Sequence, residues 1–256
     1  VEEAGRRVGE QISDILDYSE IEMDSLAVSN EDYMLSSLLN DIIVSIDHSR
    51  FKDLELVIDV DASLPLVMNT DVTKLKRIIW HLIINGLKYT RDGGVYVHLS
   101  GEKREYGINL QIEVKDTGIG MSKEEMEYIF DDFYKADSGR TRSTSGLGLG
   151  LVIVNGFVKA LKGFIAMESS PGKGTTVCVS IPQKVVDDRE CLRIKNPEAL
   201  SFGAWLHIER YGNPQVRDFY NSMVRNLMKG LKIEVHRAEN AEGFKKLASL
   251  AKEKVA

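Results

Sequence analysis

The chain has 256 residues, of which 33 are lysine or arginine and 39 are aspartate or glutamate, so its net charge is −6. This balance argues against a nucleic-acid binder that relies on clustered positive charge. A hydrophobic content of 43 % and a charged content of 28 % are typical of a globular protein with a buried core, which excludes a mainly disordered chain.

The sequence also bears on the cellular setting. Its apolar runs are too short for a membrane span, and no secretory leader opens the chain. The two cysteines, Cys178 and Cys191, are too few for a disulfide framework and lack the spacing of metal ligands. We therefore expect a cytoplasmic domain. Because the chain begins at Val1 inside a helical pattern, we expect it to be a piece of a longer protein, and any membrane anchor would belong to that parent.

The first predicted elements are helical. A helix is expected over residues 1–26, where apolar or small residues recur in steps of three and four. This narrow stripe predicts a contact with another helix, either in the same domain or in a second chain. Helices are also predicted over residues 34–51 and 71–90, the latter with Asp71 as N-cap, and a strand over residues 54–60 lies between them.

The next segment is predicted to form a hairpin and a short helix. Strands are expected over residues 95–100 and 108–116, joined by a long polar connection. Ser122 with Glu125 three residues later forms a capping box, which predicts a helix ending near Phe130.

The central third of the chain predicts a loop that leads into a helix. Residues 131–150 begin polar and cationic and end in glycines, so we expect a mobile loop before the apolar helix of residues 147–162. Two strands are expected next, over residues 163–169 and 174–182, closing near Pro182. The mixture of hairpins and helical crossovers predicts an α+β fold, a mixed sheet covered on one face by helices.

Two glycine-rich segments suggest other nucleotide-binding folds, which their context disfavours. The sequence GLGLG at 146–150 follows a polar loop, whereas a dinucleotide fingerprint follows an apolar strand. The sequence PGKGTT at 171–176 has Gly174 after Lys173, where a P-loop needs Ser or Thr.

Five segments occur in an informative order. They are HLIINGLKYT (81–90), DTGIGM (116–121), IFDDFYKAD (129–137), SGLGLGL (145–151) and PGKGTT (171–176). Together, over residues 34–183, they resemble the ATP-binding domain of sensor histidine kinases, part of the wider group shared by gyrase, Hsp90 and MutL. The resemblance implies a two-layer α+β sandwich, and the helix at the N-terminus resembles the end of that family's dimerisation and phosphoacceptor hairpin.

The resemblance implies a role for one face of the helix over residues 71–90. Asn85 is expected to hold Mg²⁺ through its amide oxygen, since this ion keeps most of its waters and bridges substrate phosphates. Lys88, three residues later on the same face, is expected to reach phosphate as a point charge. Tyr89 is expected to lie against the adenine.

The same resemblance assigns the adenine contact. Asp116 is expected to accept a hydrogen bond from the exocyclic amino group of adenine, which would select ATP over GTP because guanine has a carbonyl there. Gly118 and Gly120 would let the backbone approach the base, and Thr175 would help Asp116 through a water.

The start of the helix near residue 147 is expected to face the triphosphate. Free backbone N–H groups at a helix N-terminus carry roughly half a positive charge and bind anions. The residues expected to bind ATP there are Gly146, Leu147, Gly148 and Leu149.

The preceding loop resembles the family's ATP lid. Lys135, Arg140 and Arg142 are its expected cations, and the predicted catalytic set joins Arg140 and Arg142 to the amide and the lysine of the helix. Phe130 and Phe133 resemble the family's phenylalanine box. A solvated basic loop is the alternative for the cations, and simple core packing is the alternative for Phe130.

Two positions depart from the family pattern. The kinases commonly have Asn, and the hydrolases of the wider group a water-activating Glu, where this chain has His81. The absence of that glutamate disfavours an ATPase, since general-base catalysis accelerates a reaction roughly 10²–10⁴-fold. His81 either contacts a metal-bound water or packs passively. Gly86 replaces the usual Ala, at a cost of about 1 kcal/mol in helix stability.

The phosphoacceptor is the second gap. The family phosphorylates a histidine that is followed by an acidic residue, on the helix before the N-terminal one here. The five histidines of the chain are His48, His81, His98, His207 and His236. None has that context, so transfer would need a hairpin supplied by the parent chain. A nucleotide-binding signalling module without kinase activity is the alternative.

Residues 200–256 change in character. A strand over 203–210, a helix over 213–231 capped by Asn213, and a second strand and helix over 232–238 and 241–254 resemble the start of a response-regulator receiver.

However, Glu209 and Arg210 stand where receivers have an acidic pair for Mg²⁺. This departure favours a pseudo-receiver or a docking segment, with an ordinary interaction module as the alternative.

The resulting prediction is the catalytic ATP-binding domain of a hybrid-type histidine kinase. The expected division is a partial hairpin (1–30), the ATP-binding domain (31–183), a linker (184–199) and a receiver-like segment (200–256). Expected ligands and partners are ATP and Mg²⁺, the acceptor hairpin, a response regulator or receiver, and a second copy of the parent protein, with no nucleic acid.

Overall fold

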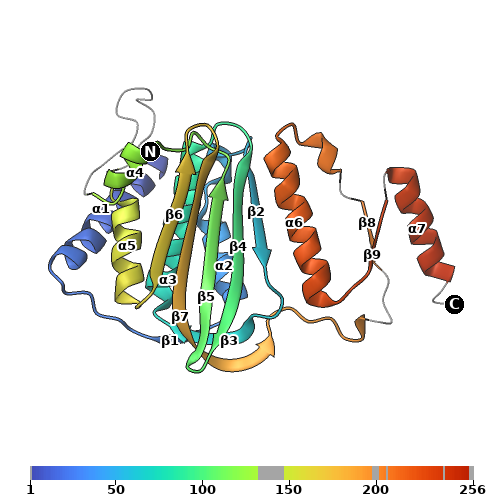
Figure 1. The fold of residues 1–256 in the computed structure, drawn as a ribbon, viewed down its shortest axis with the longest axis horizontal. Coiled ribbons are helices and arrows are strands. Elements are labelled where there is room, and N and C mark those ends of the chain that lie inside the picture. The colour runs from blue at the N-terminus through green and yellow to red at the C-terminus, as the bar shows by residue number, and fades with distance from the viewer. Residues whose placement is uncertain (1, 132–146, 198–201, 206, 239, 254–256) are drawn as a thin grey trace.

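The computed structural model describes residues 2–131, 147–197, 202–205, 207–238 and 240–253 (Figure 1). The elements of these residues, in chain order, are α1 (Glu2–Glu22), β1 (Glu31–Tyr33), α2 (Leu35–Ser45), β2 (Glu55–Val60), β3 (Pro65–Thr70), α3 (Val72–Tyr89), β4 (Gly94–Arg104), β5 (Gly107–Asp116), α4 (Lys123–Tyr128), α5 (Gly150–Ala160), β6 (Phe164–Ser170), β7 (Gly174–Glu190), β8 (Phe202–Ala204), α6 (Pro214–Leu231), β9 (Val235–Arg237) and α7 (Ala241–Glu253). Within the described residues, none of the helices is both long and apolar enough to cross a membrane.

A seven-stranded mixed sheet forms the centre of the molecule. Its order is β1-β3-β7-β5-β4-β2, and β6 pairs with β7 beside this path. The β2–β4 pair is parallel and the others are antiparallel. One edge of β7 is shared, because its first half pairs with β6 and its second half with β3. The predicted α+β fold with a mixed sheet is confirmed.

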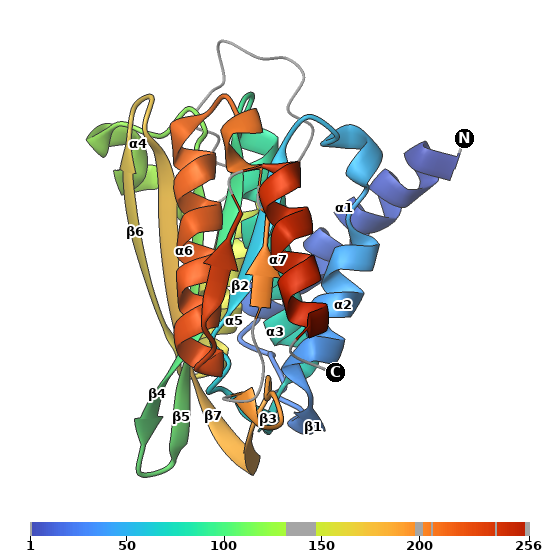
Figure 2. The ribbon, with the colours of Figure 1, turned by 90° about the vertical axis from the view of Figure 1, so that its right-hand side faces the viewer.

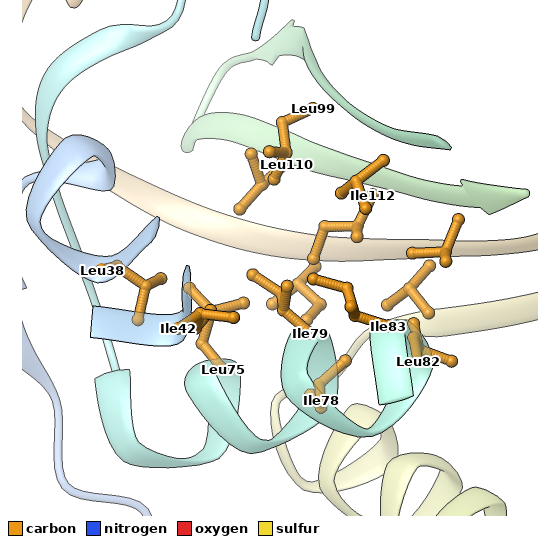
Figure 3. Packing of buried hydrophobic residues seen from close by; sticks show 14 of the residues in the cluster. Leu38, Ile42, Leu75, Ile78, Ile79, Leu82, Ile83, Leu99, Leu110 and Ile112 are labelled. Carbon is orange, nitrogen blue, oxygen red and sulfur yellow. The ribbon is translucent and has the colours of Figure 1, made fainter. Parts of the chain in front are cut away.

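Helices α3 and α5 lie side by side against one face of the sheet, and α2 packs beside α3. The apolar face of α3 explains this layer, since Ile79 and Ile83 are fully buried and face Leu110 and Ile112 of β5 (Figure 3). Burying such side chains contributes roughly 1.5–3 kcal/mol each. This layer fixes the position of α3, which carries the predicted Mg²⁺ and phosphate residues.

Local capping signals predicted two helix starts correctly. The Asp71 side chain accepts the Lys74 N–H at 3.0 Å and so caps α3. The predicted Ser122–Glu125 capping box is present at the start of α4.

Three predicted boundaries are wrong. Strands β4 and β5 continue to a two-residue connection in place of a long polar one, because the polar end of the hairpin extends beyond the helix layer into solvent (Figure 2). Strand β7 does not close near Pro182; it runs to Glu190, because residues 184–190 pair with β3. Helix α2 ends at Ser45, not near residue 51.

The C-terminal segment packs on the other face of the sheet. Helix α6 lies against β2, and α7 lies farther out beside the parallel pair β8–β9 (Figures 1 and 2). Asn213 caps α6 as predicted, accepting the Gln215 N–H at 3.0 Å. The strand expected over residues 203–210 is much shorter, since β8 ends at Ala204 and residues 208–210 form a 3₁₀ turn.

Candidate nucleotide-binding site

A cavity opens between α3, the end of β5 and the start of α5. Most of the predicted site residues that the structure describes line it, and they are Asn85, Lys88, Tyr89, Asp116, Gly120, Leu147, Gly148, Leu149 and Thr175. Gly118 does not line the cavity but donates its N–H to the carboxylate of Asp116. The predicted lid residues Lys135, Arg140 and Arg142, together with Gly146 and Phe133, lie outside the described residues. Phe130 lies just after α4 and is not part of the lining.

Asp116 ends β5 with its carboxylate nearly buried against the cavity. Its Oδ1 accepts two backbone N–H groups, from Gly118 at 2.8 Å and from Thr175 at 3.1 Å. Within the described residues, Oδ2 has no hydrogen-bond partner. Burial raises the pKa of this carboxyl, and the two backbone hydrogen bonds oppose that rise. Asp116 lines the cavity, so its carboxylate retains one acceptor atom that a ligand there could use.

Glycines let the backbone approach this carboxylate closely. A Cβ atom on Gly118 would lie 2.5 Å from the carbonyl oxygen of Tyr89, and one on Gly174 would lie 2.0 Å from the carbonyl oxygen of Asp116. Gly174 and Gly120 also have positive φ angles of 81° and 62°, a region that side chains with a Cβ rarely occupy. A side chain at any of these glycines would therefore clash with a neighbouring backbone or need a strained backbone conformation.

Ser169 of β6 supports the lining residues Met121 and Thr175, and the sequence analysis missed it. Its hydroxyl accepts the Met121 N–H at 2.8 Å and lies 2.9 Å from the Thr175 hydroxyl. The side chain thereby joins the segment after β5 to the start of β7. Nothing in the sequence distinguishes it from a surface serine, because its partners lie at other places in the chain.

Asn85 and Lys88 lie one turn apart on α3, as the sequence predicted. The Asn85 amide faces the start of α5, since a Cβ atom on Gly150 would lie 3.5 Å from Nδ2 and 3.7 Å from Oδ1. The Lys88 Nζ lies 5.3 Å from the centroid of the Tyr89 ring. An amide oxygen and an ammonium group thus border the same cavity.

Helix α5 begins at Gly150, three residues later than expected. Gly148 has a φ of 79°, and the N-cap residue Leu149 provides no side-chain hydrogen bond to the first turn. The positive end of the helix dipole therefore lies at the cavity without a side-chain cap.

Comparisons with known proteins agree with this geometry. Residues 70–185 match the protein family described as "Histidine kinase-, DNA gyrase B-, and HSP90-like ATPase". This chain carries a histidine kinase-type ATPase domain. It is 35 % identical over 188 residues to the sensor protein GacS of Pseudomonas syringae pv. syringae, covering 72 % of this chain and 21 % of GacS. It is 36 % identical over 191 residues to the autoinducer 2 sensor kinase/phosphatase LuxQ of Vibrio vulnificus (strain CMCP6), covering 73 % and 22 %.

Solved structures show the same fold. Full-length ShkA, crystallised in complex with AMPPNP, superposes with a TM-score of 0.72 at 20 % identity, covering 95 % of this chain and 48 % of ShkA. The Acinetobacter baumannii histidine kinase AdeS gives a TM-score of 0.51 at 20 % identity, covering 70 % and 79 %. The chain spans about a fifth of the length of the curated relatives named above.

His81 of the kinase-type domain is buried beside the cavity. Its ring meets Trp80 edge-on at 5.1 Å, and its Nε2 lies 3.6 Å from Oδ1 of Asp14 without forming a hydrogen bond. Burial, together with the nearby charge of Arg77, lowers the pKa of His81 to about 3. The ring is therefore neutral near pH 7. It lines the same cavity, and its Nε2 has no hydrogen-bond partner among the described residues.

Helix α1 forms a wall of the cavity that the sequence did not predict. Asp14 lines the cavity together with Glu10 and Gln11. Arg77 of α3 holds α1 in place, since its Nη2 lies 2.9 Å from Asp14 and its Nε 2.8 Å from Asp17. These side chains are about four-fifths buried, so removing one partner should cost more than in a surface ion pair, because it leaves a buried charge unpaired. The partners lie 60 or more residues apart, so no local sequence pattern reveals the contact.

Gly86 has a structural explanation. A Cβ atom there would lie 2.9 Å from Cγ2 of the buried Val95 and 3.5 Å from Cβ of Asp116. Val95 of β4 thus occupies space that an alanine at position 86 would need. The space left by glycine, where the family usually has alanine, is thus filled by Val95 next to Asp116.

Proposed function

We propose that this domain binds Mg-ATP and transfers the γ-phosphoryl group to a histidine on a helical hairpin of the parent protein, for relay to an aspartate of a response regulator or receiver. The observation that carries the proposal is the buried carboxylate of Asp116, a residue that lines the cavity. Its Oδ1 accepts two backbone N–H groups, and its Oδ2 has no hydrogen-bond partner among the described residues.

Adenine recognition follows from this acceptor. Since Oδ1 is fixed by Gly118 and Thr175, Oδ2 is the atom available to the exocyclic amino group of adenine. Guanine offers a carbonyl at that position, which would meet a carboxylate oxygen and leave both acceptors unpaired. We therefore infer that the pocket selects ATP over GTP, with Tyr89 and Gly120 lining the same space.

The triphosphate and its metal belong at the other end of the cavity. The first turn of α5 offers backbone N–H groups, and Lys88 offers a point charge. The residues described contain no group of three or more histidine, cysteine, aspartate or glutamate side chains able to hold a metal. The single amide oxygen of Asn85 suits Mg²⁺, which usually binds few protein ligands and keeps its waters. When bound, the ion would neutralise charge on the transferring phosphoryl group.

The remaining cations are predicted from the sequence. Lys135, Arg140 and Arg142 would contribute lid charges, and Gly146 the start of the phosphate-binding turn. In the proposed reaction, a nitrogen of the acceptor histidine attacks the γ-phosphorus in line. The phosphorus–nitrogen bond forms as the bond to the bridging oxygen breaks, ADP leaves with that electron pair, and the imidazole N–H proton passes to solvent. The chain's own contribution is positioning and charge stabilisation.

Hydrolysis is disfavoured by the state of His81. This residue stands where the hydrolases of the wider group have a water-activating glutamate. A base with a pKa of about 3 has little driving force for taking a proton near pH 7. A neutral imidazole with so low a pKa therefore does not replace that glutamate.

The similar proteins support the same function, because LuxQ is named as a sensor kinase/phosphatase and ShkA was crystallised with AMPPNP, an ATP analogue. We propose that α1 is the end of a dimerisation hairpin, that the parent is a homodimer, and that the domain works in the cytoplasm, where ATP is available. The exposed residues Val8, Ile12 and Leu16 of α1 support the hairpin assignment. We retain the division into partial hairpin, ATP-binding domain and receiver-like segment as a proposal.

The test has two stages. Calorimetric titration of the chain with AMPPNP and with the matching guanine analogue, each with and without Mg²⁺, should show Mg²⁺-dependent binding with a clear preference for adenine. Addition of the parent's acceptor hairpin and labelled ATP should then label the hairpin. Binding without labelling would favour the signalling module, release of phosphate without any acceptor would favour an ATPase, and absence of binding by the folded chain would refute the nucleotide site.

A further inference from the structure

The end of β5 has two chemically distinct faces. Side chains alternate along a strand, so Asp116 points to the cavity while Lys115 and Thr117 point to the opposite face of the sheet. Those two neighbours are the residues through which the position of Asp116 can be set from behind. Helix α6 contacts Lys115 directly, and its N-cap residue is linked to Thr117 through the turn at residues 92–94.

Phe219 of α6 anchors the first contact. It is buried in a small apolar cluster with Val57, Tyr96 and Val216, separate from the main core. Its ring stacks on Tyr96 at 5.2 Å with an interplanar angle of 17°, and the Lys115 Nζ lies 6.0 Å from its centroid. Helix α6 thereby covers the residue that immediately precedes Asp116.

Asn213, the N-cap of α6, makes the second contact. Its Nδ2 lies 3.5 Å from Oδ2 of Asp92, and a Cβ atom on Gly93 would lie only 2.6 Å from the same nitrogen. The Thr117 hydroxyl accepts the Gly94 N–H at 3.0 Å and donates to the Asp92 carbonyl at 3.0 Å. A short chain of contacts thus runs from the end of α6, through the turn before β4, to the residue after Asp116.

The remainder of α6 is held farther along the same face. Asn226 donates to Asp59 at 2.6 Å, and the Tyr96 hydroxyl donates to the same carboxylate at 2.5 Å. Asp59 is four residues along β2 from Glu55, which lies opposite Gly94, so this contact is distant from the turn that touches Thr117. Asn226 is nevertheless linked to Phe219, because the Tyr96 ring on which Phe219 stacks belongs to the residue that shares Asp59.

We propose that α6 positions Asp116 for adenine binding from the opposite face of the sheet, with Phe219 and Asn213 as positioning residues. The inference rests on the proposed function, because it assigns an effect on the same pocket. Loosening either contact lets the segment at 115–118 move, so that Oδ2 of Asp116 is no longer held in line with the adenine amino group. The C-terminal segment is then part of the machinery that sets nucleotide affinity and base selectivity.

Two substitutions test the contacts while keeping the fold. Asn213→Ser retains a good N-cap and removes the amide donor. Phe219→Leu retains apolar bulk and removes the ring that stacks on Tyr96 and lies near Lys115. We expect each to weaken AMPPNP binding about three- to tenfold, in line with other coupling effects, and to narrow the ratio of adenine to guanine affinity.

The matched control is Asn221→Ala, which removes the hydrogen bond that Arg237 of β9 donates to α6 at 3.0 Å, on another side of the helix from Phe219. It should lower the thermal stability of the docked helix and leave base selectivity unchanged, whereas a purely structural role for α6 would give all three variants the same nucleotide binding. Amide NMR signals of Gly118 and Thr175 should shift in Asn213→Ser and not in Asn221→Ala.

The outcomes separate the two proposals. If the wild-type chain shows no preference for adenine, the proposed function fails before the inference is tested. If the wild type shows that preference and both Asn213→Ser and Phe219→Leu retain it in full, the positioning role of α6 is overturned.

Discussion

Replacing Asp116 with asparagine should abolish adenine recognition without unfolding the domain. The two N–H groups of Gly118 and Thr175 both point at Oδ1, so the amide oxygen of D116N should occupy that place and keep both hydrogen bonds. The amide nitrogen is then left where Oδ2 was. A donor would face the amino group of adenine in place of an acceptor.

The magnitude follows from this exchange. A hydrogen bond to a charged acceptor contributes about 1.5–3 kcal/mol, and an unsatisfied buried donor costs a further 1–3 kcal/mol. The change should weaken ATP binding by about 3 kcal/mol or more, which is over 100-fold in Kd. Burial raises the pKa of Asp116, so keeping it ionised costs folding energy at neutral pH. The neutral variant should therefore be no less stable than the wild type at pH 7.

Calorimetric titration with AMPPNP and with its guanine analogue measures this effect, and thermal melts verify the fold. The D116N amide can donate to the guanine carbonyl, so the variant should also shift relative affinity toward guanine. Glu113→Gln makes the same chemical change on β5 but on the opposite face, and it should leave both affinities unchanged. A folded D116N variant that binds AMPPNP within about threefold of the wild type would refute the assignment of Asp116.

Lowering the pH should weaken AMPPNP binding as Asp116 takes up a proton. Because the pKa of Asp116 is raised above its ordinary value of 3.8, the loss of binding should begin above pH 3.8, and it should be absent in D116N. Binding titrations across pH 4–7 would show this. Gly86→Ala should gain about 1 kcal/mol in helix propensity but lose more unfolding free energy to the close contact with Val95. The double variant with Val95→Ala should lose less unfolding free energy than the sum of the two single variants, and additive values would contradict this. Arg77→Met should release α1 from α3 by leaving Asp14 without its cation, at a cost of about 1–2 kcal/mol. Hydrogen exchange of α1 amides should then be about tenfold faster, and unchanged exchange would mean that the ion pairs do not hold the helix.

Much of the site could be predicted because its requirements are local in sequence. Asp116 with Gly118 and Gly120 forms one turn, and the positive φ of Gly120 and the close backbone approach at Gly118 explain why those residue types stand at that spacing. Asn85 and Lys88 lie on one helical face for the same kind of reason. Nucleotide class and approximate site were therefore accessible from short motifs in a fixed order.

Strand lengths were less accessible than helix starts. The capping residues Asp71 and Ser122 act on N–H groups within three positions, so their effect is visible in sequence. The extension of β7 past Pro182 depends on pairing with β3, whose residues lie more than a hundred positions away. A polar stretch becomes a strand there because a partner edge is available.

The sequence by itself determined that the chain holds a histidine kinase-type ATPase fold, and it predicted Asp116 as the proposed acceptor for adenine and Asn85 as the proposed Mg²⁺ ligand. Only the tertiary structure decided that α1 walls the cavity through Arg77, that His81 is buried and neutral, that Val95 fills the space left at Gly86, and that α6 lies behind Asp116. The physical reason is the distance along the sequence over which each interaction acts. Turn, cap and helix-face preferences act over a few residues, whereas burial, charge pairing and packing join surfaces whose residues are distant along the chain.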